Sequence, residues 1–174
     1  MGMFSNCPLP DKMPALMSQH MPAYAYCRMF YGCTSLSSQE GSPNSVVTMK
    51  PFFLEGHAMD GMFSYCSSLV SAAISTPYKD STLTCLGKDF YSMFSYCSSL
   101  SALSCAILRK TSDSLSLRDD PFGTSFWNWM LNVHKTGVYT GPDILSSLSP
   151  SRGAAGIPEG WSIEYGLDPV YYCN

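Results

Sequence analysis

The sequence has little charge. Only 13% of its 174 residues are Asp, Glu, Lys or Arg, about half the usual share of roughly 25%. The net charge is −3, and the ten basic residues form no stripe, which disfavours a nucleic-acid surface. The polar residues are instead mostly Ser, Thr, Gly, Asn and Tyr. Such a composition suits neutral hydrogen-bonding contacts.

Several motifs are also missing. No apolar run approaches the 18 residues of a transmembrane helix, and the first residues lack the charged and apolar regions of a signal peptide. No Cys-x-x-Cys pair, Gly-rich phosphate loop or Asn-x-Ser/Thr acceptor occurs. The pair Asp119-Asp120 has no Asp-x-Asp-x-Asp context, so it predicts a helix start rather than a calcium site. We expect no metal and no cofactor.

Catalysis has no supporting pattern in this sequence. A cysteine nucleophile needs a histidine within reach, and none of His20, His57 and His134 shares a local signature with a cysteine. The sequence therefore predicts a protein that is not an enzyme.

What the sequence does contain is a repeat. The string Met-Phe-Ser-Tyr-Cys-Ser-Ser-Leu occurs at Met62–Leu69 and again, unchanged, at Met93–Leu100. A looser copy lies at Met29–Leu36, and a degraded one at Met3–Leu9. A duplication of this length is very improbable by chance, so the chain is a repeat protein.

The repeat predicts a shared core. Its cysteines, Cys7, Cys33, Cys66 and Cys97, are 26, 33 and 31 residues apart, so length variation falls in loops. We expect these cysteines to be buried thiols, with a disulfide between neighbouring coils as the alternative. The predicted repeat core is Met29, Phe30, Cys33, Leu36, Met62, Phe63, Cys66, Leu69, Met93, Phe94, Cys97 and Leu100.

Each repeat shows helical spacing followed by a strand pattern. Tyr26, Met29, Phe30 and Cys33 stand at i, i+3, i+4 and i+7, the stripe of an amphipathic helix. The stretches 69–74 and 100–105 then match the strand consensus of a leucine-rich repeat. After Leu36 this pattern is poor, and residues 46–49 form a displaced strand candidate.

The predicted fold class is therefore α/β, a leucine-rich-repeat-like solenoid of about four short coils. Each coil has one short helix and one short strand, and together they occupy residues 1–118. Residues 119–174 form a C-terminal cap, with a helix through Phe126, Trp129 and Met130 and strands at 137–140 and 157–165. Nothing within the sequence covers the first coil, so we expect either an N-terminal truncation of the sequence or a neighbouring domain or subunit there.

The outward positions of the predicted strands are the candidate contact surface, with a plain solvated sheet as the alternative. They are Val70, Ser71, Ala73, Ser101, Ala102 and Ser104. Trp127 lies off the apolar stripe of the cap helix and is added as an exposed aromatic, whereas Trp129 and Trp161 are expected to plug the end of the stack.

The repeat resembles the Met-Phe-x-x-Cys-x-x-Leu core of the BspA-type leucine-rich repeat surface proteins, found in gut Bacteroidetes and some of their phages. The segments 129–131, 136–139 and 156–163 resemble the endings of such proteins. The resemblance implies an extracellular, non-enzymatic binding or adhesion module that recognises a protein or glycan on a host or matrix surface. A phage-tail or virion protein that contacts a receptor is the alternative. Neither reading implies nucleic acid or membrane insertion.

Overall fold

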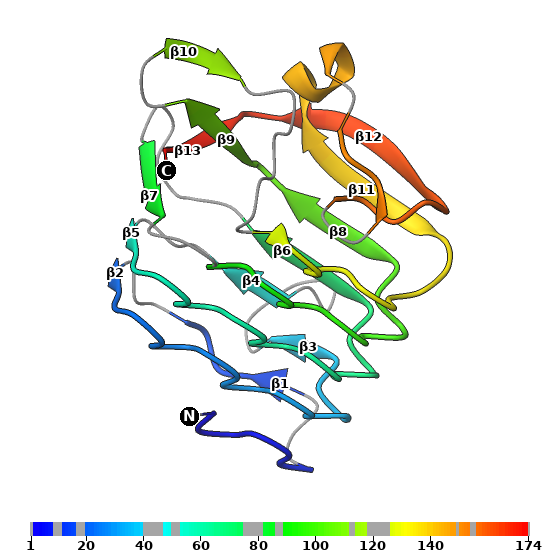
Figure 1. The fold of residues 1–174 in the computed structure, drawn as a ribbon. Coiled ribbons are helices and arrows are strands. Elements are labelled where there is room, and N and C mark those ends of the chain that lie inside the picture. The colour runs from blue at the N-terminus through cyan, green and yellow to red at the C-terminus, as the bar shows by residue number, and fades with distance from the viewer. Residues whose placement is uncertain are drawn as a thin grey trace.

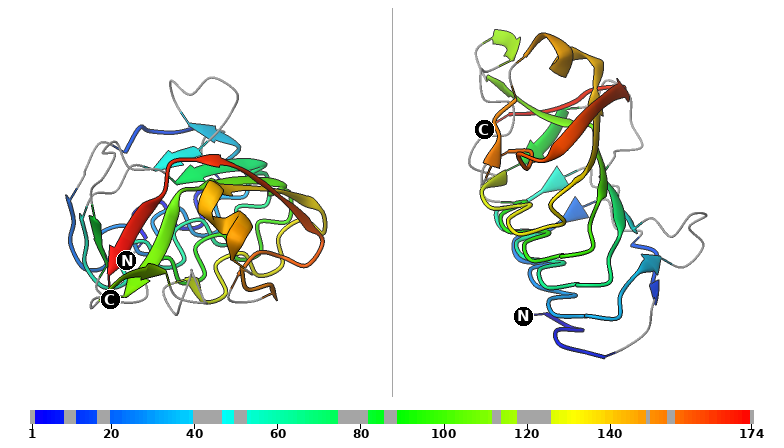
Figure 2. Two further views of the ribbon diagram at one scale, coloured as in Figure 1. Left: turned by 90° about the horizontal axis from the view of Figure 1, so that it is seen from above. Right: turned by 90° about the vertical axis from the view of Figure 1, so that its right-hand side faces the viewer.

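The computed structural model describes residues 2–8, 12–16, 20–39, 47–49, 53–74, 82–85, 89–111, 114–117, 126–148, 150–153 and 156–173. Within them the chain winds in stacked coils, one above another from the N-terminal end (Figure 1). Figure 2 shows the same stack from its side, with the C-terminal strands crossing at the far end.

The strands form two main sheets and one small pair. The five-stranded sheet has the order β12-β11-β8-β6-β4 and is parallel throughout. Its strands are β4 (Val47–Met49), β6 (Ser71–Ile74), β8 (Ala102–Cys105), β11 (Gly137–Pro142) and β12 (Trp161–Leu167).

The second sheet has the order β10-β9-β13-β7-β5-β2, and only its β9–β10 pair is antiparallel. Its strands are β2 (His20–Met21), β5 (Phe53–Leu54), β7 (Thr82–Cys85), β9 (Ile107–Thr111), β10 (Ser114–Leu117) and β13 (Val170–Cys173). The short strands β1 (Lys12–Met13) and β3 (Ser38–Gln39) pair with each other. A 3₁₀ turn, η2, spans Asp143–Ser147.

The prediction of a helix–strand solenoid is wrong. The described residues contain parallel strands and turns but no α-helix. The segment Tyr26–Cys33 and its equivalents are successive β-turns, and so is the described part of the expected cap helix at Phe126–Leu131. The start of that expected helix, at residues 119–122, lies outside the described residues. We call the stacked turn segments, residues 2–7, 22–33, 55–66, 89–97 and 126–133, the turn ladder.

Backbone amides in the turn ladder alternate between two kinds of partner. The N–H groups of Met29 and Cys33 donate to the carbonyl three residues earlier, at 3.1 Å. The N–H groups of Phe30 and Gly32 donate instead to the next coil, to the carbonyls of Met62 and Ser64 at 3.0 and 2.8 Å. Buried backbone groups must be paired, and this alternation pairs them within a coil and between coils.

Every fourth residue of the ladder takes a left-handed backbone conformation. In the third coil these residues are His57, Gly61 and Tyr65, with φ of 63°, 59° and 64°. A four-residue turn repeat places apolar side chains at i, i+3, i+4 and i+7 as readily as a helix does. Because the two structures share this spacing, the apolar pattern of the sequence does not distinguish a helix from successive turns.

The inward side of the ladder is a stack of phenylalanines. Phe30, Phe63 and Phe94 lie one above another, with ring centroids 5.7 and 5.6 Å apart and planes within 5° of parallel. Phe4 continues the stack beyond Phe30, at 5.4 Å. Eleven of the twelve predicted core residues are buried, and Met29 is half-buried. The six cysteines whose side chains are described form no disulfide.

The last part of the chain joins both sheets. β11 pairs with β8 and β12 pairs with β11, which lengthens the five-stranded sheet. β13 inserts between β7 and β9 in the other sheet, so the chain crosses from one sheet to the other after β12 (Figure 2). Trp129 and Trp161 are buried there, and their indole N–H groups donate to the carbonyls of Gly156 and His134 at 2.8 and 2.9 Å.

Candidate functional site

The predicted contact residues of the sheet lie on its outer side. Ser71 and Ala73 in β6, and Ala102 and Ser104 in β8, are half-buried and alternate with buried neighbours. Val70 is 50% exposed and Ser101 half-buried, just before the two strands. The pairing continues this face into β11, where Val138 lies beside Ala102 and Thr140 beside Ser104. The surface so formed carries only small side chains.

Trp127 belongs to a different part of the molecule. It is 49% exposed and lies on the outward side of the turn ladder, at the ladder position that Tyr91 occupies one coil earlier. The structure therefore separates the candidate contact residues into a strand group and a ladder residue.

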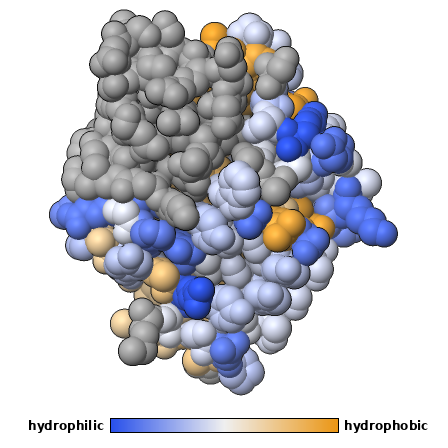
Figure 3. All heavy atoms as spheres, in the orientation of Figure 1, coloured by the Kyte–Doolittle hydropathy of each residue, from blue (hydrophilic) through white to orange (hydrophobic). Residues whose placement is uncertain are grey.

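The outward side of the turn ladder carries a groove that the sequence analysis missed. Ladder segments cross the near side of the molecule in Figure 1, and the same side in Figure 3 is dominated by weakly hydrophilic colours. The groove has a volume of about 280 Å³. The aromatic and charged residues that line it are Tyr31, Tyr65, Tyr91, Tyr96, Arg28 and Asp60.

Tyr65 and Tyr96 form the aromatic wall of the groove. Their rings are parallel within 4°, with centroids 4.5 Å apart, and Tyr31 packs against Tyr65 at 5.2 Å with a tilt of 55°. The two stacked residues are 42% and 39% exposed. Desolvation, followed by the neighbouring phenols of Tyr96 and Tyr31, raises the pKa of Tyr65, so the Tyr65 hydroxyl is a neutral hydrogen-bonding group at neutral pH.

The floor of the groove is polar and internally bonded. The hydroxyls of Ser64 and Ser95 donate to the carbonyl oxygens of Ser92 and Asn128 at 2.6 and 2.5 Å. Both serines are buried, so these bonds fix the floor. Each joins one coil to the next and holds the left-handed residue of that coil in place.

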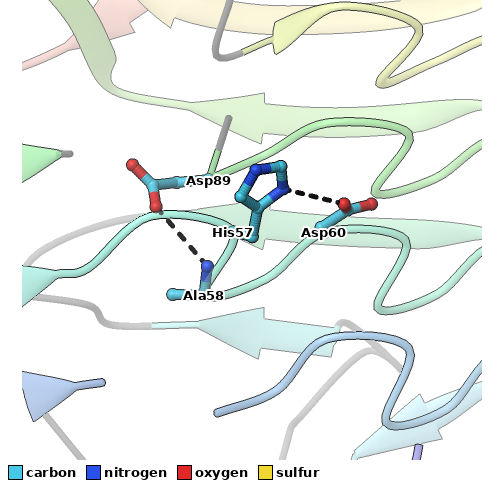
Figure 4. Close-up of polar contacts among 4 residues, drawn as sticks. All are labelled: His57, Ala58, Asp60 and Asp89. Atoms are coloured by element: carbon cyan, nitrogen blue, oxygen red, sulfur yellow. Dashed lines mark hydrogen bonds and ion pairs between the residues drawn. The ribbon is translucent and has the colours of Figure 1, made fainter. Parts of the chain in front are cut away.

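One cation and one anion face this groove. The Arg28 guanidinium lies over the Tyr31 ring, 5.8 Å from its centroid. Gly61 makes room for it, because a Cβ there would lie 3.3 Å from the Arg28 Cγ. Asp60 is half-buried and bonds His57, with 3.1 Å between Oδ2 and Nδ1 (Figure 4).

Figure 4 also shows the carboxylate of Asp89. Asp89 is fully buried, and its Oδ1 accepts from the Ala58 backbone N–H of the preceding coil at 3.5 Å. The backbone carbonyl of Asp89 accepts a hydrogen bond from the backbone N–H of Met59, one residue after Ala58, at 3.1 Å. Asp89 thus links two coils through both its side chain and its backbone, which is a structural task.

Four cysteines, Cys27, Cys66, Cys97 and Cys105, are poorly suited to nucleophilic chemistry. Burial raises the pKa of the Cys97 and Cys105 thiols to about 12 and raises that of Cys66 still further. Burial also raises the pKa of Cys27, and the charge of Asp60 adds to this. A protonated thiol is a weak nucleophile. No cluster of three His, Cys, Asp or Glu in the described part of the chain could hold a metal ion.

The sequence held one signal for the groove. Tyr65 and Tyr96 occupy the same place in the two identical repeats, one residue before the buried cysteine. Packed helices lie about 8–10 Å apart, too far for two such rings to stack face to face, whereas the ladder brings their centroids to 4.5 Å. The described helical segments include none long and apolar enough to span a membrane.

No protein-family model, curated protein or solved structure matches the chain.

Proposed function

We propose that this protein is a non-enzymatic binding module at a bacterial cell surface, and that its turn-ladder groove holds a neutral glycan. The observation that carries the proposal is the exposed, stacked pair Tyr65–Tyr96 beside a polar floor. Tyrosine offers a large apolar body and a hydroxyl at one site, which is what a sugar ring with its mixed faces requires.

The charge of the groove favours a neutral ligand. Arg28 and Asp60 are one cation and one anion, and the other lining residues are Tyr, Ser, Asn, Gly and Leu. An acidic ligand would be repelled by Asp60 and a basic ligand by Arg28. Neutral hydroxyl groups, by contrast, can pair with either side chain and with the phenols.

The groove is also open and rigid. Its volume of about 280 Å³ lies just below the range of roughly 300–1,000 Å³ typical of sites that enclose a small molecule. A chain-like ligand lying across several coils fits this shape better than an enclosed metabolite. The tyrosines are held by stacking and by fixed left-handed backbones, so little side-chain entropy would be lost on binding.

The cellular setting rests on the resemblance of the Met-Phe-x-x-Cys-x-x-Leu repeat to BspA-type surface proteins. A phage-tail or virion protein that contacts a receptor is the alternative setting for the same groove. Gene neighbourhood separates the two, because tail genes on both sides would contradict the cell-surface setting.

The groove itself is tested with a panel of neutral and acidic oligosaccharides, followed by calorimetric titration of those that bind. We expect neutral glycans to bind, and Tyr65→Asn and Tyr96→Asn each to weaken binding at least tenfold. Asparagine keeps the left-handed backbone, as Asn132 does at the equivalent position one coil further on.

The matched control is Tyr24→Asn. Tyr24 is also an exposed ladder tyrosine with φ of 60°, but it stacks on His57 and does not line the groove. Equal losses in all three variants, or binding of acidic glycans alone, would contradict the proposal. Unchanged binding in Tyr65→Asn and Tyr96→Asn would move the contact to another face, such as the outer side of β6 and β8.

A further inference from the structure

The stack of exposed tyrosines ends before the last coil of the turn ladder. The backbone N–H of Tyr96 donates to the carbonyl of Leu131 at 2.7 Å, which places Asn132 one coil beyond Tyr96 at the equivalent position. Asn132 is exposed, with φ of 56°. Among the described rings, Tyr96 stacks only on Tyr65. Its face toward the last coil is thus free of aromatic partners, although the ladder continues past it.

A second hollow continues the groove along the last coil. Its volume is about 170 Å³. Leu131 lines this hollow and the groove alike, so the two adjoin at one half-buried side chain. Equivalent residues of neighbouring coils lie about 4.8 Å apart, the spacing of hydrogen-bonded strands, which is close to the length of one hexose unit in a glycan chain. The residues that line the second hollow are Met130, Leu131, Asn132, Gly153, Pro158 and Glu159.

Hydrogen bonds hold the outer wall of the second hollow in place. The Arg152 guanidinium donates from Nη1 to the carbonyls of Pro158 and Trp161, at 3.2 and 2.9 Å. The same segment is fastened to the ladder, because the Trp129 indole N–H donates to the carbonyl of Gly156 at 2.8 Å. The wall is therefore formed before a ligand arrives, which lowers the entropic cost of binding.

Two polar side chains in the second hollow have no partner among the described residues. Glu159 is exposed and forms no ion pair with any of them, and the side-chain amide of Asn132 bonds none of them. A carboxylate accepts hydrogen bonds at both oxygens, and an amide both donates and accepts. Met130, Leu131 and Pro158 supply apolar surface beside them. A few polar groups on an apolar lining are typical of small-molecule sites.

The second hollow differs from the groove in charge. Among its described lining residues Glu159 alone is charged, whereas the groove has both Arg28 and Asp60. Arg152 does not line the hollow, and its guanidinium bonds backbone carbonyls. An acidic sugar would be repelled by the Glu159 carboxylate, and a neutral sugar would not.

We infer that the groove and the second hollow are consecutive subsites for one glycan, and that the second holds a neutral hexose unit. Glu159 accepts hydrogen bonds from two adjacent hydroxyls of that unit, and Asn132 pairs with a third. The Tyr96 ring, open toward the last coil, contacts the glycan where it passes from one subsite to the other. This inference rests on the proposed glycan function, and it adds that the ligand is a neutral chain running along the ladder from Tyr65 toward Glu159.

The test is the dependence of affinity on chain length. The probes are linear neutral series, from disaccharide to hexasaccharide, of cello-, malto- and β-1,4-manno-oligosaccharides, titrated calorimetrically against the whole chain. We expect one series to bind with an affinity that rises about tenfold from disaccharide to tetrasaccharide, equivalent to about 1.4 kcal/mol. The longer chain fills both subsites, whereas the disaccharide fills the groove alone and is the reference for each variant.

Two variants remove the polar groups of the second subsite. Glu159→Ala and Asn132→Gly should each abolish most of the gain with length. Glycine keeps the left-handed backbone, as Gly32 does at the equivalent position of the second coil. The matched control is Glu164→Ala, since Glu164 is an exposed carboxylate in β12 outside both subsites. It should keep the whole gain.

The outcomes separate this inference from the proposed function. A series that binds with the same affinity at every length would overturn the second subsite, and so would a loss in Glu159→Ala no larger than that in Glu164→Ala. The proposed function would survive either result if Tyr65→Asn still weakened binding. Failure of every neutral series to bind would overturn both. Thermal unfolding of each variant shows whether a loss of affinity comes from a loss of structure.

Discussion

The thiol of Cys97 donates a hydrogen bond to the carbonyl oxygen of Phe63 in the preceding coil, with 3.0 Å between sulfur and oxygen. The same oxygen accepts the backbone N–H of Cys66 at 3.1 Å. Both lone pairs of a buried carbonyl are therefore satisfied, one from its own coil and one from the next. A small apolar side chain with a donor is needed at this position, and cysteine is the residue that combines the two.

Removing this thiol should destabilise the protein measurably. We expect Cys97→Ala to lower the free energy of unfolding by about 1–2 kcal/mol, because it leaves a small void and removes a donor. Urea denaturation followed by circular dichroism measures the change. Cys27→Ala is the control, since Cys27 is half-buried and outside the column. Equal losses in the two variants would show that the hydrogen bond contributes nothing.

Stability should also fall at high pH. Burial raises the pKa of Cys97 and Cys105 from 9.0 to about 12, so the folded protein keeps these thiols neutral while the unfolded chain ionises them. Their contribution is fully present below pH 9 and is lost as the pH rises from 9 to 12. Urea titrations between pH 7.5 and 10.5 measure this slope.

The matched variant for that experiment is Cys97→Val, because Val133 occupies the equivalent position in the last coil. It should show a shallower loss of stability with pH than the wild-type protein. A slope that is the same in both proteins would rule out the Cys97 thiol as its source.

The phenylalanine stack should make unequal contributions along its length. We expect Phe63→Ala to cost about 3–5 kcal/mol, because Phe63 is fully buried between two parallel rings. Phe4→Ala should cost clearly less, since Phe4 is half-buried and, among the described rings, stacks only on Phe30. Chemical denaturation of the two variants side by side gives both values. A cost at Phe4 equal to that at Phe63 would contradict the partial burial of Phe4.

Left-handed ladder positions should respond to backbone preference rather than to side-chain size. Ser92 has φ of 52°, and its equivalents in neighbouring coils are Gly61 and Asn128. We expect Ser92→Gly to stabilise the protein by about 0.5–1 kcal/mol and Ser92→Val to destabilise it by about 1–2 kcal/mol. Thermal unfolding by calorimetry distinguishes them. A stabilising valine would contradict the assigned backbone conformation.

The strands of the five-stranded sheet were largely predictable from the sequence, whereas β2, β5, β7, β9 and β13 of the second sheet were not. β6 and β8 lie within the two stretches that follow the identical repeats, and β4 and β11 coincide with the predicted short strands at residues 46–49 and 137–140. Alternating burial along β6 and β8 follows from the two-residue period of a strand. Local pattern is sufficient where side chains must point alternately in and out.

The turn ladder was not predictable by periodicity alone. Spacing at i, i+3, i+4 and i+7 is common to a helix and to four-residue turns, so only backbone preference separates them. Asn6, Gly32, Gly61, Asn128 and Asn132 all have positive φ, and Gly and Asn are the residues that adopt it most readily. These residues recur at two equivalent ladder positions four residues apart, and this recurrence favours turns over a helix. The groove was missed for the same reason, because a helix does not stack Tyr65 on Tyr96.

The alternation of amide partners has a consequence for how such a protein can vary. Backbone hydrogen bonds set the register between coils, so exposed side chains that do not bond or stack on a neighbouring coil can change without disturbing it. The 26-, 33- and 31-residue intervals between successive cysteines show that the connecting segments can lengthen while the column stays aligned. A coil can then be exchanged as a unit, and the exchange changes part of the outward surface while the backbone frame stays intact.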